Sequence, residues 1–294
     1  MILVIFARST SFVMTKIGLQ EMETFSLLGF RFLTAFLLLL PFGWKRLSRI
    51  SLKDLTKGML LGASFFATMA AEVSGLQTTN ASTASFLENT AIVFVPLFEA
   101  VLNRRAPGIP VLISTVLSLF GVGLLTLKDG SFQLSGGELL CLLSAVFYAC
   151  SIILTDRISK QGDPLALGIL QVGFMGAYSV AAALFLGSPR IPSTIQTWVM
   201  ILTLAVVCSG FGFTLQPLAQ RYTTAERAGL FCALGPVGAT ISARIFLNET
   251  IGFTGACGIL LILTGMALIP LYDRFLERRA MAHEIQQNNS GIHP

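Results

Sequence analysis

The sequence predicts an all-α integral membrane protein with ten transmembrane helices, arranged as two inverted five-helix repeats. Three observations lead to this prediction: an apolar composition, a series of segments long enough to cross a bilayer, and a weak internal repeat. The chain has 294 residues, of which 54% are hydrophobic and 12% are charged, whereas a soluble domain carries roughly 25% charged residues. A chain this apolar cannot cover itself with polar surface, so its main partner is expected to be the lipid bilayer.

Composition also excludes several function classes. The net charge of +5 comes from Lys and Arg residues scattered between apolar segments, so no nucleic-acid partner is expected. The five cysteines form no CxxC pair, and the two histidines, His283 and His293, lie near the C-terminus. This arrangement argues against a zinc site and against His-based catalysis. No P-loop motif is present, so the chain predicts no cofactor, no metal and no ATP-driven pumping of its own.

Ten apolar segments of near-spanning length follow one another along the chain. They cover residues 1–20, 24–42, 57–77, 81–102, 107–127, 136–155, 164–186, 195–219, 225–247 and 251–272. A span needs about 20 residues at 1.5 Å rise per residue. Backbone polar groups must be satisfied in lipid and the alternating pattern of a β-barrel is missing, so the segments are predicted to be helices. The first one is the most polar, and we expect it to lie in the interior.

The connectors between these segments predict the orientation. If both termini are cytoplasmic, the inner connectors and the C-terminal segment hold 14 of the 20 basic residues, and the outer side holds three: Lys16, Lys128 and Arg190. The positive-inside rule therefore places both termini in the cytoplasm, in a multi-pass protein of the plasma (inner) membrane. The segment 273–294 is predicted to be a polar cytoplasmic tail.

A faint internal repeat divides the chain into two halves. A shift of 145 residues aligns Phe86 with Phe231, and a shift of 140 aligns "FRF" at 30–32 with "LQV" at 170–172. The halves are 1–128 and 136–272, joined by "DGSFQLS", and each contains five segments. An odd number of spans makes the second half enter the membrane from the opposite face. Such inverted repeats are typical of secondary transporters with a site between the halves.

Several stretches carry a resemblance to a known family. They are "STSFVMTK" at 9–16, "FRFLTAFLLLL" at 30–40, "GLQTTNASTASFLENTAIVFVPLFEAVL" at 75–102, "RYTTAERAGLFCALGPV" at 221–237 and "FLNE" at 246–249. Together they make the chain resemble an EamA-like transporter of the drug/metabolite transporter superfamily, over residues 1–272. The chain departs from the family pattern at Arg8 and Arg104, where Trp and Glu are usual. The resemblance implies a carrier of small molecules, often an exporter of metabolites or amphipathic compounds, and leaves the substrate open.

Three ionisable residues fall at one depth on three successive predicted helices. Arg31 lies about 10 Å, Glu72 about 8 Å and Glu88 about 10 Å below the outer edge, at 1.5 Å per residue. A lone charge in hydrocarbon costs a few kcal/mol, so we expect Arg31 to meet Glu88, Glu72 or both in the bundle interior. Either the group binds substrate or a coupling proton, or it is a static ion pair that holds helices together.

Polar residues at helical spacing mark other interior faces. One stripe contains Thr68 and Glu72, a second contains Tyr148 and Ser151, and a third contains Ser209 and Gln216. Such stripes either line a path for the substrate or connect helices through hydrogen bonds and close packing. Small residues on two further segments, Ser114, Ser118 and Gly121 and then Gly252, Gly255 and Gly258, serve either packing within the chain or a homodimer seam.

These observations together favour a secondary active transporter, expected to be an exporter, that moves a small metabolite or drug-like molecule by alternating access. The substrate-binding or coupling residues would be Arg31, Glu72, Glu88, Tyr148, Ser151 and Gln216. An uncoupled facilitator or channel-like protein is the main alternative. A membrane-embedded enzyme is a weaker one, because no catalytic constellation is present.

Overall fold

The structure is a computed structural model of the chain. It describes residues 11–102, 104, 108–128, 131–132, 135–187 and 189–222, and further on residues 239, 245–246, 252–261, 263–265, 267–268, 271–272 and 274. The first ten residues, nearly all of the expected segment at 225–247, and the polar tail apart from Arg274 lie outside the described residues.

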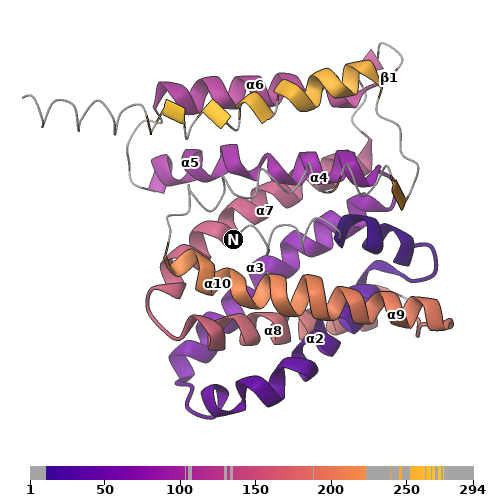
Figure 1. Ribbon diagram of the computed structural model, residues 1–294, viewed down its shortest axis with the longest axis vertical. Coiled ribbons are helices and arrows are strands. Elements are labelled where there is room, and N and C mark those ends of the chain that lie inside the picture. Colours follow the sequence, from indigo (N-terminus) through magenta and orange to yellow (C-terminus); the bar gives the residue numbers. More distant parts are fainter. Residues whose placement is uncertain are drawn as a thin grey trace, which may run out of the picture.

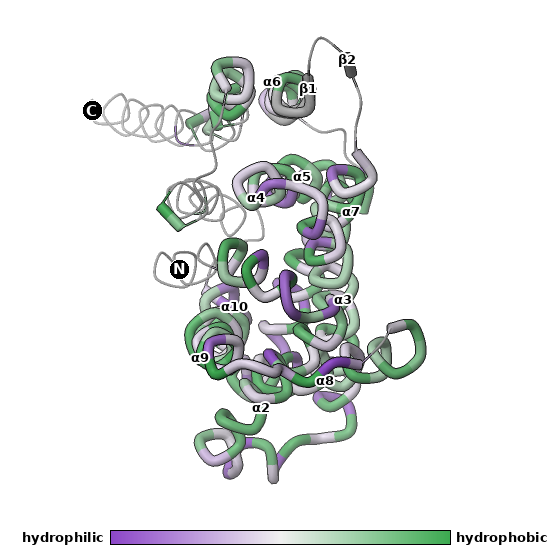
Figure 2. Tube along the Cα trace, turned by 90° about the vertical axis from the view of Figure 1, so that its right-hand side faces the viewer, coloured by the Kyte–Doolittle hydropathy of each residue, from purple (hydrophilic) through white to green (hydrophobic). Residues whose placement is uncertain are grey.

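Six helices of the described part are long and apolar enough to cross a membrane. They are α2 (Thr24–Leu47), α3 (Leu52–Leu76), α4 (Ala81–Asn89) continued by α5 (Ala91–Leu102), α7 (Gly136–Ser159), α8 (Pro164–Leu186), and α9 (Ile195–Thr203) continued by η1 (Leu204–Phe213) and α10 (Thr214–Arg221). Residues 11–18 are also helical, and α6 (Ile109–Thr126) and a shorter apolar helix, Phe253–Gly265, cover two more expected segments. Figure 1 shows the helices stacked in layers, and Figure 2 shows that apolar residues predominate along them.

The helices begin where the sequence provides a capping residue. Ser51 caps α3 by accepting a hydrogen bond from the Asp54 amide. Ser135 and Glu138 form a reciprocal capping box at the start of α7, and Asp163 caps α8 directly before Pro164. These side chains satisfy amide groups that an isolated helix end leaves unbonded, which fixes the first turn of each helix.

Two ends of the bundle can be distinguished from contacts between connectors. At one end, Arg46 pairs with Asp163 at 2.6 Å, Lys57 Nζ donates to the Gln161 carbonyl at 3.3 Å and Arg221 donates to the Gly162 carbonyl at 3.4 Å. The α2–α3 connector, the α7–α8 connector and the end of α10 therefore share this end, which we call the basic end.

Two further connections mark the opposite end of the bundle. There, the Gln77 amide donates to Thr24 Oγ1 at 2.7 Å, and the Arg190 backbone N–H donates to Ser26 Oγ at 3.2 Å. These bonds join the start of α2, the end of α3 and the α8–α9 connector. Among the described helices, α2 and α3 therefore run in opposite directions between the two ends, and so do α8 and the span from α9 to α10, as the sequence predicts.

Glycines allow the central helices to approach closely. A Cβ at Gly62 of α3 would lie 2.5 Å from Phe174 Cβ of α8, and one at Gly176 of α8 would lie 2.9 Å from the Leu33 nitrogen of α2. At Gly168 of α8, a Cβ would collide with the Thr214 carbonyl oxygen of α10. Small residues at crossings are the common device for packing helices in membranes, because they bring backbones together.

The structure departs from the sequence prediction in the connectors and breaks. The expected cytoplasmic loop at 43–56 is mostly helical, since α2 continues to Leu47 and α3 starts at Leu52. The fourth segment breaks at Thr90, whose amide and hydroxyl both donate to the Leu87 carbonyl. This break lies six residues before Pro96, which lies inside α5. The chain is also not purely helical, because β1 (Leu127–Lys128) pairs with β2 (Ser131–Phe132) between α6 and α7.

Ser114, one residue of the small-residue stripe on α6, contacts another part of the same chain. The hydroxyl of Ser114, which is buried, donates to the Gly265 carbonyl. Figure 1 shows α6 beside the described residues near the C-terminal end. At Ser114, therefore, the stripe serves packing within the chain.

Candidate functional site

Arg31 is a buried cation that hydrogen-bonds with two other segments of the chain. Its side chain is 1% exposed, about 10 Å along α2 from Thr24 at 1.5 Å per residue. Its Nε–H donates to Ser209 Oγ of η1 at 2.7 Å, and one terminal nitrogen donates to Thr15 Oγ1 at 3.4 Å. The guanidinium carbon also lies 5.0 Å from the ring centroid of Phe32, a distance at which cation–π attraction acts. Arg31 thus joins residue 15, α2 and η1.

The helix that provides Ser209 is a π-helix. The ten residues Leu204–Phe213, with the sequence "LAVVCSGFGF", have i→i+5 hydrogen bonding in place of the i→i+4 bonding of an α-helix. π-helical turns occur frequently at functional sites, because the wider turn redirects side chains relative to the regular helix. The sequence placed Ser209 on an interior stripe but did not predict its pairing with Arg31.

An aromatic row extends the site from Arg31 to Tyr148. The Phe32 and Phe213 ring centroids are 5.5 Å apart, those of Phe213 and Phe65 5.6 Å, and those of Phe65 and Tyr148 6.3 Å. All three contacts are edge-to-face, a favoured geometry for aromatic pairs. The row crosses from α2 through η1 and α3 to α7, and all four side chains are buried. It provides a rigid apolar wall next to the guanidinium.

The predicted hydroxyl stripes meet each other. Ser151 Oγ of α7 lies 3.3 Å from Thr68 Oγ1 of α3. Each hydroxyl also lies within hydrogen-bonding distance of a carbonyl of its own helix: Ser151 of Phe147 and Thr68 of Ser64. This pair connects two helices in the structure. Gln216 of α10 is likewise buried in the interior.

The carboxylates gather toward the end of the bundle opposite the basic end. Glu72 of α3 and Glu88 of α4 are both buried, and the Cys141 thiol lies within electrostatic range of both and of Glu138. The structure therefore brings Glu72 and Glu88 close to one location, as the sequence predicts. Their pairing with Arg31 stays a prediction, since the hydrogen bonds of Arg31 described above go to hydroxyl groups. Glu138 is a third carboxylate near Cys141 that the sequence analysis did not select. The "SGGE" capping box at 135–138 could have revealed it.

Gln171 is a further interior polar residue that the sequence analysis did not select. It lies on α8, its side chain is 0% exposed, and no described residue hydrogen-bonds with either end of its amide. An unsatisfied buried polar group costs about 1–3 kcal/mol, so native proteins rarely keep one without a water, ligand or other use. The shift of 140 residues that aligns "FRF" with "LQV" makes Gln171 the counterpart of Arg31 in the second half. That alignment is the signal that could have found it.

Comparison with known proteins identifies the class of the chain. The EamA-like transporter family matches it twice, over residues 1–127 and 135–271. An uncharacterized transporter of Archaeoglobus fulgidus is 28% identical over 277 residues, covering 88% of this chain and 91% of the relative. An uncharacterized transporter of Bacillus subtilis is 27% identical over 283 residues, covering 90% and 89%.

A solved crystal structure shares the fold, with a TM-score of 0.71 and 17% sequence identity, and the match covers 93% of this chain and 96% of that one. The several apolar helices and these matches make the protein a multi-pass membrane protein, and they confirm the resemblance drawn from the sequence. The chain belongs to the EamA-like transporter family.

Proposed function

We propose that the protein is a secondary active transporter that exports a small metabolite or drug-like molecule by alternating access. In this proposal ten transmembrane helices form two inverted five-helix repeats, residues 1–128 and 136–272, followed by a polar tail at 273–294. The transport-named relatives and the family support the transporter class. The halves would move against each other around a site near the middle of the membrane.

The observation that carries the proposal is the contact of Arg31 with Ser209. It joins the first half of the chain to the second through a charged hydrogen bond of 2.7 Å. α2 also packs along α8, its counterpart under the 140-residue shift, and the two aligned positions, Arg31 and Gln171, are both buried. A buried cation and a buried amide at related positions suit an interior site at the repeat interface.

The chemistry of this site suggests what it would hold. Arg31 offers a planar fork of donors for an acceptor-rich or anionic group, and the row of Phe32, Phe213, Phe65 and Tyr148 offers an apolar wall. Gln171 and Gln216 could present amides to polar substituents. The substrate would then be a small amphipathic molecule with an acceptor group, which Arg31, Tyr148, Ser151 and Gln216 would help to bind.

Glu72 and Glu88 are the proposed carriers of a coupling proton. Both are buried carboxylates in membrane-spanning helices, and burial favours the neutral form of a carboxyl group. Flux with and without an imposed pH gradient tests this role. Uphill accumulation that follows the gradient supports it. If the gradient has no effect on uphill accumulation, Glu72 and Glu88 are structural or bind substrate only. If no uphill accumulation occurs at all, the protein is an uncoupled facilitator.

The proposed orientation places the basic end, and both termini, in the cytoplasm of the plasma (inner) membrane. It is supported by the 14-to-3 distribution of basic residues. We predict that a cysteine at Ser48, an exposed residue of the α2–α3 connector, resists an impermeant thiol reagent in intact cells and reacts after permeabilisation. The background lacks native cysteines, and a cysteine at Ser193 in the α8–α9 connector is the matched control. Ready labelling at Ser48 in intact cells would reverse the orientation.

The substrate class can be found by ligand stabilisation of the purified protein. A screen over amino acids, nucleosides, sugars and organic cations should raise the melting temperature for the compounds that bind. The same compounds should then fail to stabilise Arg31→Gln. Stabilisation that is unchanged in Arg31→Gln would place the binding site elsewhere.

A further inference from the structure

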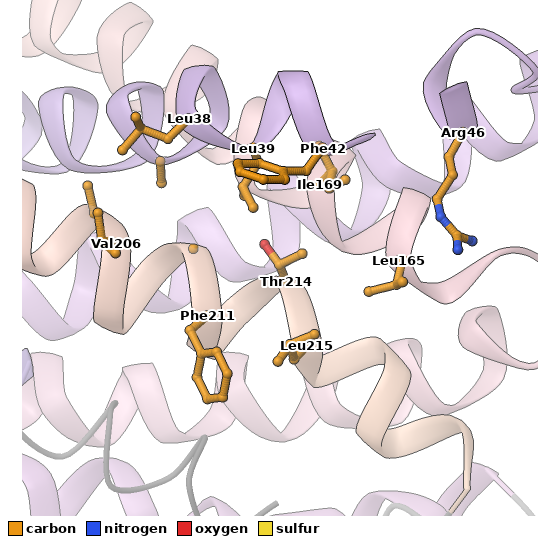
Figure 3. A pocket seen from close by; sticks show the side chains of 13 residues that line it. Leu38, Leu39, Phe42, Arg46, Leu165, Ile169, Val206, Phe211, Thr214 and Leu215 are labelled. Carbon is orange, nitrogen blue, oxygen red and sulfur yellow. The ribbon is translucent and has the colours of Figure 1, made fainter. Parts of the chain in front are cut away.

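An apolar groove opens on the surface between α2, α8 and η1. It encloses about 420 Å³ and is lined by Leu38, Leu39 and Phe42 of α2, Ile169 of α8, and Val206 and Phe211 of η1, among others. Figure 3 shows Leu39, Phe42 and Ile169 close together and facing Thr214, with the Phe211 ring pointing away from them. Leu38, Phe42, Val206 and Phe211 are exposed, and they lie on helices that are long and apolar enough to cross a membrane. The groove is therefore open to lipid.

The same groove ends at a group of cations. Its last lining residue toward the basic end is Arg46. A second cavity of about 530 Å³ shares Phe42 and Arg46 with the groove and adds Lys45 and Arg49. Figure 3 shows Arg46 set apart from the apolar side chains. One continuous surface thus runs from an apolar body to a cationic end.

The carboxylates of the cationic end are already engaged within the protein. Asp163 pairs with Arg46 at 2.6 Å, and Asp54 lies 3.6 Å from Lys57. The exposed side chains of Lys45 and Arg49 add two positive charges beside these pairs. The end of the groove is therefore complementary to an anion.

The dimensions of the groove fit one leaflet of a bilayer. Its lining on α2 runs from Ala35 to Arg46, which is about 16 Å at 1.5 Å per residue. Half of a hydrocarbon core of about 30 Å is about 15 Å. An acyl chain in the groove would thus bring its headgroup to the level of the cations.

From these features we infer that the groove binds an anionic glycerophospholipid. An acyl chain lies along Leu38, Ile169 and Val206, and the phosphate lies between Lys45 and Arg49. Basic pockets between transmembrane helices recognise such headgroups by charge. The inference stands apart from the proposed transport function, and its test measures lipid binding and no flux.

The test uses the full-length protein in a neutral detergent, with bound lipid counted by native mass spectrometry. The probes are phosphatidylglycerol, phosphatidylcholine and soluble glycerol 3-phosphate. The headgroup variant is Lys45→Gln with Arg49→Gln, and Val206→Trp fills the groove from an exposed position. The control, Lys53→Gln with Arg157→Gln, removes two exposed cations from the same end, outside both cavities.

Phosphatidylglycerol should bind to the wild type more tightly than phosphatidylcholine. The headgroup variant should lose about twenty-five-fold in affinity for it, from about fivefold for each of the two basic residues. Val206→Trp should also lose affinity, and the control variant should not. Equal binding of both lipids, or an equal loss in the control, would overturn the inference. Binding of glycerol 3-phosphate as tight as that of the lipid, and unchanged in Val206→Trp, would make the site one for a soluble phosphate.

Discussion

The Nε of Arg31 lies 2.7 Å from the hydroxyl oxygen of Ser209, although 178 residues separate the two along the chain. One belongs to α2 in the first half, and the other to the π-helix η1 in the second. Both are buried, so water cannot replace the bond at low cost. Any motion of the two halves against each other must therefore keep, exchange or break this contact.

The first prediction concerns the stability that this bond provides. Ser209→Ala should lower the free energy of unfolding in mixed micelles by about 1.5–3 kcal/mol, because it removes the acceptor of a buried charged donor. Ser179→Ala is the matched control, since Ser179 is also fully buried but donates to the Met175 carbonyl of its own helix at 2.7 Å. Losses of the same size in both variants would contradict a special role for the pair.

The second prediction concerns the geometry of Arg31. Arg31→Ala should abolish flux of a compound found by the stabilisation screen, and Arg31→Lys should retain only a small part of it. The guanidinium donates from two different nitrogens, to Ser209 and to Thr15, and a single ammonium cannot reproduce this fork. Wild-type flux in Arg31→Ala would place this arginine outside the working interior.

The third prediction separates a structural role of Arg31 from a functional one. Arg31→Gln combined with Glu88→Gln leaves neither partner as a buried lone charge. The proposal predicts that this double variant folds, as judged by size-exclusion chromatography and thermal unfolding, but does not transport. If flux returns to the wild-type level along with folding, Arg31 and Glu88 form a static bridge only.

The fourth prediction concerns Gln171. Gln171→Leu should raise the free energy of unfolding of the ligand-free protein by about 1–3 kcal/mol, because it removes an unsatisfied buried amide. The same change should abolish stabilisation by compounds from the screen. Gln196→Leu, at an exposed position, controls for the added apolar surface. A Gln171→Leu protein that is less stable than the wild type, or still stabilised by those compounds, would show that the amide has another partner.

The fifth prediction concerns pH at the basic end. Partial burial raises the pKa of Asp163, but the hydrogen bond and charge of Arg46 and the Leu165 backbone N–H outweigh it and hold the pKa below its usual range. A lowered pKa in the folded state stabilises the protein above pH ~4, the unfolded value, and the gain is lost as pH falls through the folded value.

Asp163→Asn tests this sign, because asparagine keeps the helix cap while removing the charge. The variant should be less stable than the wild type by under ~1 kcal/mol at pH 6, since both side chains of the pair are partly exposed. The difference should shrink as pH falls below ~4, the unfolded value, and through the lowered folded value. A difference that grows as pH falls would contradict the direction of the pKa shift.

The sequence predicted the limits of a span well where start and stop residues lie directly beside the apolar segment. α8 was expected at 164–186 and occupies Pro164–Leu186, because Asp163 and Pro164 mark its start and Gly187 its end. α2 ends after its expected limit at residue 42, and α3 begins before its expected limit at residue 57. A helix continues beyond its apolar segment as far as its capping residues, and hydropathy does not detect these polar turns. The ends at Leu47 and Leu52 are set by polar residues and Ser51.

The sequence predicted that three ionisable side chains lie in the interior, but it did not predict which groups Arg31 contacts. Counting residues along a helix places Arg31, Glu72 and Glu88 at one level, and all three are buried. The side of the helix on which each partner lies depends on helix rotation and packing, which residue counting does not provide. The π-helical bonding of η1 shifts this rotation again, and nothing in "LAVVCSGFGF" distinguishes i→i+5 from i→i+4 bonding. Ser209 therefore appeared as one member of a stripe, without its arginine.

The central claim is that the protein carries a small molecule across a membrane through a site that contains Arg31. Counterflow in liposomes tests it most directly: a labelled compound from the screen is added outside, with the same unlabelled compound inside. We predict saturable uptake that the inner compound stimulates, recovery of the label in chemically unchanged form, and loss of the stimulated uptake in a folded Arg31→Gln protein. Uptake that rises linearly with concentration and ignores the inner compound, or label recovered as a different molecule, would contradict the account.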